Sequence, residues 1–320
     1  MTRKEITRRE LLQRSAALGC MAAVPLSLAA SSAHSFAHGQ SAGGIQDAAK
    51  RIAGPNPLTP PSSGTIPVAF PISDGAVVID FCGPYEVFRV ATGKDGNRAF
   101  RLFTVADKIA PIKCSGDMIV VPNYTFENAP TPKVIVIPAQ NGATDAMIRW
   151  IRESTKTTDV TMSVCTGAFV LAQTGLLSGK AATTYHYAYT DLAMQYPDIR
   201  VKRGYRFVEE GKIATAGGLT SGMDLALRVV ERYYGRDKAL ETADNLEYQG
   251  QGWMDSSGAA NANYATAPSG LVCVICGMPV DAKTALNSVY KGHTYYFCNQ
   301  GHKDTFDHDQ EKALHVAATQ

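Results

Sequence analysis

The chain has 320 residues, of which 45% are hydrophobic, and its formal net charge is +2. This length accommodates one full α/β domain and a small extra module, and the hydrophobic fraction is that of a protein with a buried core. The near-neutral charge excludes a broad electrostatic footprint for nucleic acid. No segment beyond the N-terminal region reaches the roughly 18 apolar residues that span a bilayer.

The N-terminus has the layout of a secretory signal. The adjacent Arg8 and Arg9 precede two leucines and an apolar run over residues 16–30. This arrangement is typical of a twin-arginine (Tat) signal, which we place at residues 1–37. It predicts a periplasmic protein that does not span the membrane once the signal is removed. An uncleaved helix or membrane anchor is the alternative.

Composition divides the rest of the chain into two domains and two linkers. Residues 38–65 and 251–270 are rich in small residues, proline or asparagine and lack hydrophobic periodicity, so we predict linkers there. The first linker leads to a main domain at residues 66–250. The second separates that domain from a cysteine-rich tail at residues 271–320.

The main domain alternates apolar strand patterns with helix patterns, which predicts an α/β fold with a parallel sheet covered on both faces. The expected strands are residues 66–71, 100–106, 133–138 and 160–164. The expected helices are residues 143–153, 222–234 and 237–248, with another directly after the last strand. Residues 78–81 are expected to lead into residues 83–88, a turn that feeds a helix.

Cys165 lies at the junction of a buried strand and a helix. Thr166 and Gly167 follow it, and their small side chains leave room for a substrate. The helix dipole and the free N–H groups at such a junction lower a thiol pKa and can hold an oxyanion. Cys165 is therefore a candidate nucleophile with an expected pKa below about 8.5. A buried structural cysteine is the alternative, since free cysteines pack like small hydrophobes.

Four ordered segments resemble the ThiJ/PfpI superfamily, whose fold is related to class I glutamine amidotransferases. They are DFCGPYEVF (80–88), SVCTGA (163–168), GLLSGKAATT (175–184) and TAGGLTSGMD (215–224). The likeness is strongest to the isonitrile hydratase-like branch, which is also found as the sensory half of some AraC-type regulators. The resemblance implies a parallel-sheet sandwich, a homodimer and a reactive cysteine.

The same resemblance implies roles for three residues in one site. Cys165 matches the family's nucleophile, Asp80 the carboxylate beside its sulfur, and Thr166 a residue that takes part in the hydratase reaction. A carboxyl group beside a thiolate is pushed toward its protonated form and can then donate a proton to the reacting centre. Without the resemblance, a helix N-cap role for Asp80 is the better interpretation.

The sequence departs from the family pattern at two places. Ala139 and Gln140 stand where relatives have a Gly-Gly pair whose amides help to form the oxyanion hole, so Gln140 is expected to reshape that pocket. His186 follows Tyr185, whereas relatives place a histidine directly after the threonine pair. A Cys165–His186 dyad and an ordinary polar role for His186 therefore remain alternatives.

The tail carries four side chains of metal-ligand type. Cys273 and Cys276 form a C-x2-C pair, and Cys298 and His302 form a C-x3-H pair after an expected hairpin at 287–297. In so small a module this spacing predicts a site for zinc or another soft or borderline metal. The tail resembles the YHS domain and related treble-clef modules, with His302 in place of a cysteine, which favours zinc over copper. A disulfide between two of the cysteines is the alternative.

These patterns predict an exported cysteine-nucleophile enzyme with a metal-binding tail. The expected partner of the main domain is a small electrophile, of the isonitrile class by resemblance, and no cofactor is expected there. The Cys165 thiolate attacks carbon, Asp80 handles the proton, and amides near Thr166 and Gln140 hold developing charge. The competing hypothesis is a non-catalytic protein that senses electrophiles or oxidants through Cys165 or handles heavy metals.

Overall fold

The computed structural model describes residues 56–255, 257 and 271–319, which lie within one compact unit. The predicted signal and most of both predicted linkers lie outside these residues. The described part of the chain has no helix with both the length and the hydropathy needed to cross a bilayer.

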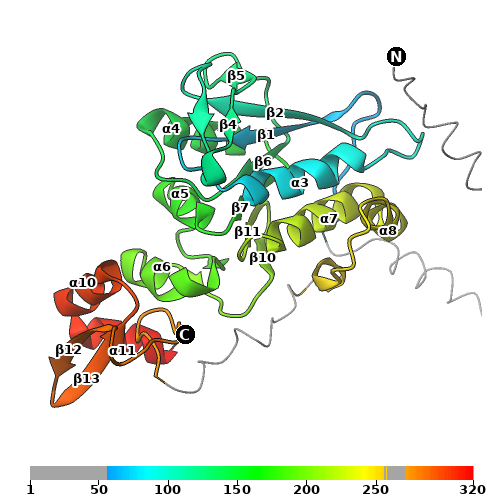
Figure 1. The fold of residues 1–320 in the computed structure, drawn as a ribbon. Coiled ribbons are helices and arrows are strands. Elements are labelled where there is room, and N and C mark those ends of the chain that lie inside the picture. Colours follow the sequence, from blue (N-terminus) through cyan, green and yellow to red (C-terminus); the bar gives the residue numbers. More distant parts are fainter. Residues whose placement is uncertain (1–55, 256, 258–270, 320) are drawn as a thin grey trace, which may run out of the picture. The chain divides into compact units, whose positions relative to one another are not determined.

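Strands and helices alternate along the chain (Figure 1). The strands are β1 (Ile66–Pro71), β2 (Phe100–Ala106), β3 (Ile112–Lys113), β4 (Ile119–Val120), β5 (Tyr124–Thr125), β6 (Val134–Ile137), β7 (Val160–Val164), β8 (Ala181–Ala182), β9 (Arg200–Val201), β10 (Phe207–Glu210), β11 (Ile213–Ala216), β12 (Leu286–Tyr290) and β13 (His293–Phe297). The α-helices are α3 (Val78–Val90), α4 (Asp145–Thr155), α5 (Gly167–Gln173), α6 (Tyr189–Gln195), α7 (Ser221–Tyr234), α8 (Arg236–Asn245), α10 (Gln300–His308) and α11 (Gln310–Thr319). Short 3-10 turns are η1 (Ser115–Asp117), η2 (His186–Ala188) and η3 (Gly252–Met254).

Seven strands form one sheet in the order β10-β11-β7-β6-β1-β2-β5. Neighbouring strands run parallel except β10 and β11, which are antiparallel. The predicted α/β fold is confirmed, and its central strands are buried apolar runs, as expected for a sheet covered on both sides. Because β1, β6, β7 and β11 are parallel, their carboxyl ends lie at one edge, where ligands bind in sheets of this kind.

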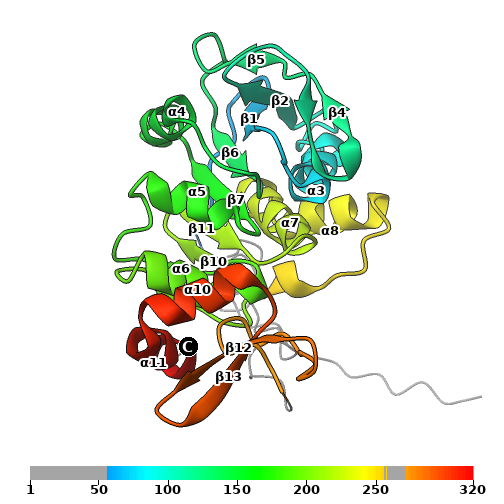
Figure 2. The same cartoon turned by 60° about the vertical axis from the view of Figure 1, so that its left-hand side comes forward.

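Helices cover both faces of the sheet (Figures 1 and 2). Successive residues of β6 point to opposite faces, so Val134 and Val136 belong to the core under α3, α7 and α8. Ile135 and Ile137 belong to the core under α4 and α5. The central strand therefore contributes to both layers, which fixes its register against its neighbours.

Helix α3 differs from the sequence-based expectation. It begins at Val78, with Val77 at the N-cap, and continues through Pro84. The predicted turn within residues 83–88 is therefore wrong, and so is the N-cap interpretation of Asp80. Pro84 removes one helical hydrogen bond, but Phe81 and Phe88 are buried in the core on either side of it. Tertiary packing outweighs the local break.

The tail folds around its own small core. The predicted hairpin is confirmed as β12 and β13, which pair antiparallel. Phe297 and Phe306 lie 5.2 Å apart between ring centroids and are fully buried with Ile275. This core is small, so a module of this size depends on additional cross-links or ligands for stability.

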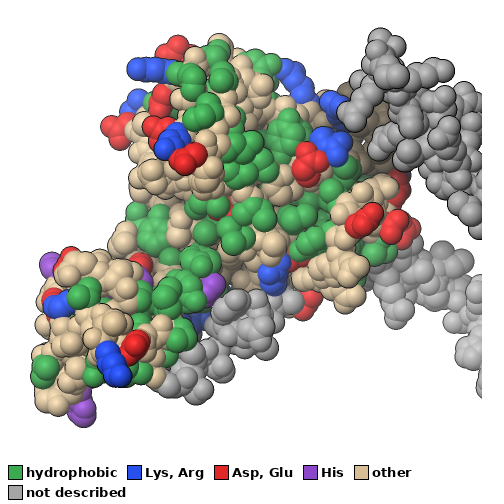
Figure 3. All heavy atoms as spheres, in the orientation of Figure 1, with side chains coloured by type: hydrophobic (Ala, Val, Ile, Leu, Met, Phe, Trp, Pro, Cys, Tyr) green, Lys and Arg blue, Asp and Glu red, His purple; other side chains and the backbone are tan. Residues whose placement is uncertain are grey.

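Charged groups are paired on the surface and in the interior. On the face drawn in Figure 3, cationic and anionic side chains lie intermingled. Inside the main domain, Arg228 contacts Glu209 and Glu231 at 3.0 Å each, and Arg232 contacts Glu209 at 3.0 Å. The two pairs that involve Glu209 connect α7 to β10. Removal of one partner would leave an unpaired buried charge and destabilise the fold by about 3–5 kcal/mol.

Candidate active site and metal centre

Cys165 lies on a sharp, strained turn between β7 and α5. Its φ is +58°, in the left-handed region that non-glycine residues rarely adopt. Its N–H donates to the Gly217 carbonyl at 2.8 Å, and its own carbonyl accepts the Thr184 hydroxyl at 2.9 Å. These bonds hold the residue in the conformation of a nucleophile elbow, as the strand-to-helix pattern predicts.

Gly167 allows α5 to start close against the sheet. A Cβ atom at this position would lie 2.3 Å from the carbonyl oxygen of Ile137 in β6, a contact with rigid backbone. Any larger residue would push the helix start away from the strand. The glycine therefore fixes the turn that carries Cys165 at the carboxyl edge of the sheet.

Three residues act on the Cys165 sulfur. The N–H and hydroxyl of Thr166 and the N–H of Leu219 lower the pKa of the Cys165 thiol, and the charge of Asp80 raises it. Two converging amides of this kind can stabilise negative charge in a transition state. The sequence indicated Thr166 but missed Leu219, which has a φ of +51°. The only signal was the Gly217-Gly218 pair that precedes it.

Asp80 is fully buried in the first turns of α3. Its Oδ2 accepts the Ala139 N–H at 3.1 Å, and its buried Oδ1 has no geometrically ideal partner among the described residues. Burial raises the pKa of this carboxyl from 3.8 to about 6, while the Ala139 N–H and Cys165 counter part of the rise. A carboxyl with such a pKa can both accept and donate a proton near neutral pH.

The thiol of Cys165 is not acidified. Burial, and then the charge of Asp80, raise its pKa to about 12, although hydrogen bonds from Thr166 and Leu219 oppose the rise. The expected low pKa is therefore wrong, because the side chain is only 7% exposed and desolvation exceeds the effect of the helix start. The two pKa values favour a pair in which the proton stays on the sulfur and Asp80 carries the charge at neutral pH.

The structure gives Gln140 and His186 partners other than Cys165. The Gln140 Oε1 accepts the N–H of Ser73 at 2.7 Å and the hydroxyl of Ser73 at 2.9 Å, so this side chain connects the loop after β1 to the loop after β6. The ring of His186 packs between Tyr185 and Tyr187, at centroid distances of 4.4 and 3.9 Å. Burial lowers the pKa of His186, which favours a neutral imidazole.

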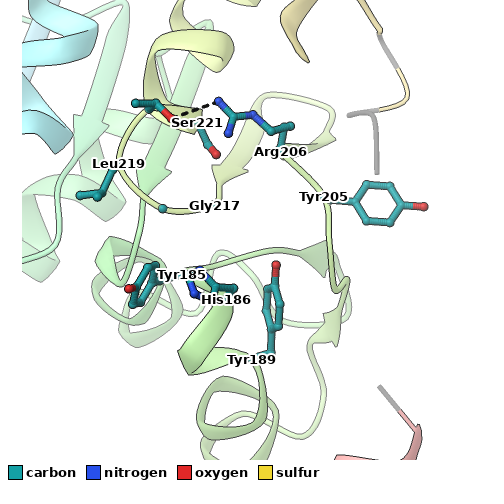
Figure 4. A pocket seen from close by; sticks show the side chains of 10 residues that line it. Tyr185, His186, Tyr189, Tyr205, Arg206, Gly217, Leu219 and Ser221 are labelled. Atoms are coloured by element: carbon teal, nitrogen blue, oxygen red, sulfur yellow. Dashed lines mark hydrogen bonds between the residues drawn. The ribbon is translucent and has the colours of Figure 1, made fainter. Parts of the chain in front are cut away.

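A cavity of about 270 Å³ lies beside the elbow. Figure 4 shows Tyr185, His186 and Tyr189 on one side of it, with Leu219 and Arg206 on the other. Leu219 belongs to both the elbow and the cavity, since its N–H acts on the Cys165 sulfur and the residue lines the cavity. This volume admits a small molecule with an apolar group, and the aromatic lining suits such a group.

The cavity wall includes one fixed cation. The Arg206 Nε lies 2.6 Å from the buried Oδ2 of Asp224, and the Tyr248 hydroxyl donates to the Oδ1 of the same carboxylate at 3.1 Å. The guanidinium is thereby held in place at the wall, with its charge balanced by Asp224.

The four predicted metal ligands of the tail come together. The ligand atoms of Cys273, Cys276, Cys298 and His302 all lie within 4.8 Å of one another. The His302 Nδ1 is 3.2 Å from the Cys298 Sγ and 3.5 Å from the Cys273 Sγ, and the Cys276 and Cys298 sulfurs are 3.6 Å apart. Hydrogen bonds from Cys276 and His302 hold the pKa of Cys273 well below its usual value, against the effect of burial.

These spacings fit a tetrahedral zinc ion. Zinc–sulfur bonds of about 2.3 Å and zinc–nitrogen bonds of about 2.0 Å place two sulfurs about 3.8 Å apart, and sulfur and nitrogen about 3.5 Å apart. All six described cysteines are free thiols, so the disulfide alternative is not adopted in this structure. Asn299 caps α10 by accepting the His302 N–H at 2.9 Å, which orients the fourth ligand.

Two family models match the chain. The DJ-1/PfpI family matches residues 67–232, and the YHS domain matches residues 274–316. The first range contains the elbow and its surroundings, and the second contains all but the first of the four clustered metal ligands.

Individual relatives are enzymes and regulators. Isonitrile hydratase from Pseudomonas putida is 35% identical over 199 residues, which are 61% of this chain and 81% of the hydratase. The HTH-type transcriptional regulator GbdR from Pseudomonas aeruginosa is 20% identical over 186 residues, 57% of this chain and 50% of the regulator. The crystal structure of a ThiJ/PfpI family protein from Pseudomonas syringae has the same fold, with a TM-score of 0.54 and 21% identity over 82% of this chain and 95% of that chain.

Proposed function

The chain belongs to the DJ-1/PfpI family, and from that premise we propose that its α/β domain is a cysteine-dependent hydratase of small electrophiles, with isonitriles as first candidates. The observation that carries the proposal is the placement of Cys165 on a strained elbow beside Asp80. The similarity to a protein named isonitrile hydratase supports the choice of substrate class.

The first chemical step forms a carbon–sulfur bond. Cys165 starts protonated and Asp80 ionised, and the cavity holds the organic group of R–N≡C beside the sulfur. As sulfur bonds to the terminal carbon, Asp80 accepts the thiol proton and delivers it to that carbon. The product is the thioimidate R–N=CH–S–Cys, and no other reactant is consumed.

The second step releases product with one water molecule. Water adds to the thioimidate carbon, and Asp80 relays its proton to the nitrogen. The carbon–sulfur bond then breaks, the thiol of Cys165 is restored, and the formamide R–NH–CHO leaves. The amides of Thr166 and Leu219 face the sulfur and stabilise the charge that develops around it.

For the tail we propose a structural zinc site. Four protein ligands, Cys273, Cys276, Cys298 and His302, would complete a tetrahedral shell and leave no open position for substrate. When bound, zinc would supply folding free energy to a module with a small core. We further propose export to the periplasm through the twin-arginine signal, a route that carries folded cargo with its metal site already assembled.

A second candidate is a non-catalytic sensor that binds or is modified by a small electrophile. The similarity of this chain to half of the regulator GbdR favours it. The two candidates differ in stoichiometry, because a sensor reacts once for each site whereas an enzyme regenerates its thiol.

The test is formamide formation from a panel of isonitriles, measured as product per protein over many equivalents of substrate. We expect sustained turnover that Cys165→Ala abolishes and that Asp80→Asn slows by a factor of about 100 or more, because an amide cannot relay the proton. Cys82→Ala is the matched control, as it removes a half-buried thiol from α3. Turnover that survives Cys165→Ala refutes the mechanism, and product limited to one equivalent supports the sensor.

A further inference from the structure

The tail's histidine ligand is in contact with a carboxylate of the other domain. While the Nδ1 of His302 faces the sulfurs, its Nε2 lies 3.1 Å from the Oδ2 of Asp191. Asp191 belongs to the first turn of α6, in the α/β domain, and it is separated from His302 by 111 positions in sequence. Metal-bound histidines typically donate their second N–H to such a carboxylate, which fixes the ring and makes it a better ligand.

We propose that Asp191 is the outer-shell partner of the tail's metal site, so that the α/β domain helps to hold the metal and the metal holds the tail against that domain. This inference rests on the proposed zinc site. It assigns Asp191 a positioning role, since the carboxylate acts on the metal through His302 and does not bind the metal itself.

Other contacts place the tail on the same segment. Lys312 of α11 donates to the Met194 carbonyl of α6 at 3.1 Å, and α6 and α11 pack against each other (Figure 2). Tyr187 and Met194 pack against the buried core of the tail. The interaction between His302 and Asp191 is therefore one part of a continuous contact with residues 187–194.

The α/β domain also offers a charge that suits a metal–thiolate cluster. Three thiolates around a divalent ion leave one net negative charge. Arg203 lies close enough to Cys276 for their charges to interact, and its buried Nε has no hydrogen-bond partner among the described residues. Its Nη2 donates to the Thr190 hydroxyl at 2.8 Å. The cation is thus held by Thr190, the residue before Asp191 in sequence, and within electrostatic reach of Cys276.

The contacted segment also forms one wall of the cavity. His186 and Tyr189 line the cavity, whereas Tyr187, between them, packs on the tail. The Tyr189 hydroxyl accepts the Gly204 N–H at 3.0 Å. Docking of the tail therefore restrains the same short segment that shapes the cavity, and metal loading is expected to order that wall.

The first experiment measures zinc affinity of the full chain by competition with a chromophoric chelator. We expect Asp191→Ala to weaken zinc binding by 10–100-fold, the usual cost of losing an outer-shell partner. Asp191→Asn should lose less zinc affinity, because the amide oxygen of asparagine can still accept the histidine N–H. The control Asp304→Asn removes an exposed carboxylate from α10 itself, two positions from His302, and should keep wild-type affinity. Circular dichroism in chelator verifies that each variant is folded.

The second measurement is amide hydrogen exchange over residues 187–195. Zinc should increase protection there in the wild-type chain, and Asp191→Ala should remove most of that increase even at saturating zinc. Equal zinc affinity of wild type and Asp191→Ala, or equal protection with and without zinc, overturns the inference and leaves the metal site intact. A wild-type chain that binds no zinc refutes the proposed metal site itself, and the inference with it.

Discussion

Replacing Asp80 with asparagine should stabilise the fold at neutral pH while impairing the proposed reaction. Asp80 is fully buried, and burial raises its pKa from 3.8 to about 6. Between these two values the folded protein binds more protons than the unfolded chain, so this group's contribution to stability falls as pH rises through that window. One pKa unit corresponds to about 1.4 kcal/mol, so ionised Asp80 costs about 3 kcal/mol at pH 8.

Asparagine has nearly the same shape, and its amide oxygen can still accept the Ala139 N–H that now reaches Oδ2. Asp80→Asn should therefore raise the free energy of unfolding, and this gain should be about 2–3 kcal/mol larger at pH 8 than at pH 4. Urea unfolding followed by circular dichroism measures this difference, with chelator in every sample to keep the tail in one state. The control Asp145→Asn removes one exposed carboxylate from α4 and so reports charge loss alone.

If wild type and Asp80→Asn differ in free energy of unfolding by the same amount at pH 4 and pH 8, this reasoning is refuted. It would mean that the folded protein leaves the pKa of Asp80 near its unfolded value. A difference of opposite sign would mean that ionised Asp80 is stabilised by its surroundings more than it is penalised by burial. Either result would remove the basis for Asp80 as a proton carrier near neutral pH.

Two further predictions concern the thiol and the signal. Because the charge of Asp80 raises the pKa of Cys165, Asp80→Asn should shift the pH dependence of iodoacetamide labelling of Cys165 to lower pH, as peptide mass spectrometry can measure. A pH dependence that is unchanged or moves to higher pH in the variant would contradict this effect of the Asp80 charge. Changing Arg8 and Arg9 together to lysine should keep the precursor in the cytoplasm, and normal appearance of this double variant in the periplasmic fraction would contradict the twin-arginine signal.

Much of the main domain could be predicted because its strands carry local signals. The bounds of β1, β2 and β7 agree with the predicted strands residue for residue. The elbow at Cys165 follows from a buried strand that runs directly into small residues. The course of α3 through Pro84 could not be predicted in the same way, because a helix that contains a proline depends on packing against the sheet rather than on local preference.

The site was only partly predictable, for the same reason. Asp80 and Thr166 could be placed near Cys165 through a family resemblance. The Leu219 amide depends on a left-handed turn, for which the preceding Gly217-Gly218 pair is the only sequence signal. The pKa of Cys165 depends on burial by distant segments. Asp191 was missed because its relation to His302 exists only when α6 and the tail are in contact.

The protonation state of the resting site favours catalysis over sensing. A sensor of oxidants needs an accessible thiolate, because the thiolate is the species that oxidants attack. Burial and the charge of Asp80 instead keep Cys165 protonated at neutral pH, which protects the sulfur in an oxidising compartment such as the proposed periplasm. Asp80, with a pKa of about 6, can remove that proton once an electrophile is bound beside the sulfur. Reactivity is then tied to substrate binding, a condition that suits an enzyme better than a stoichiometric thiol sensor.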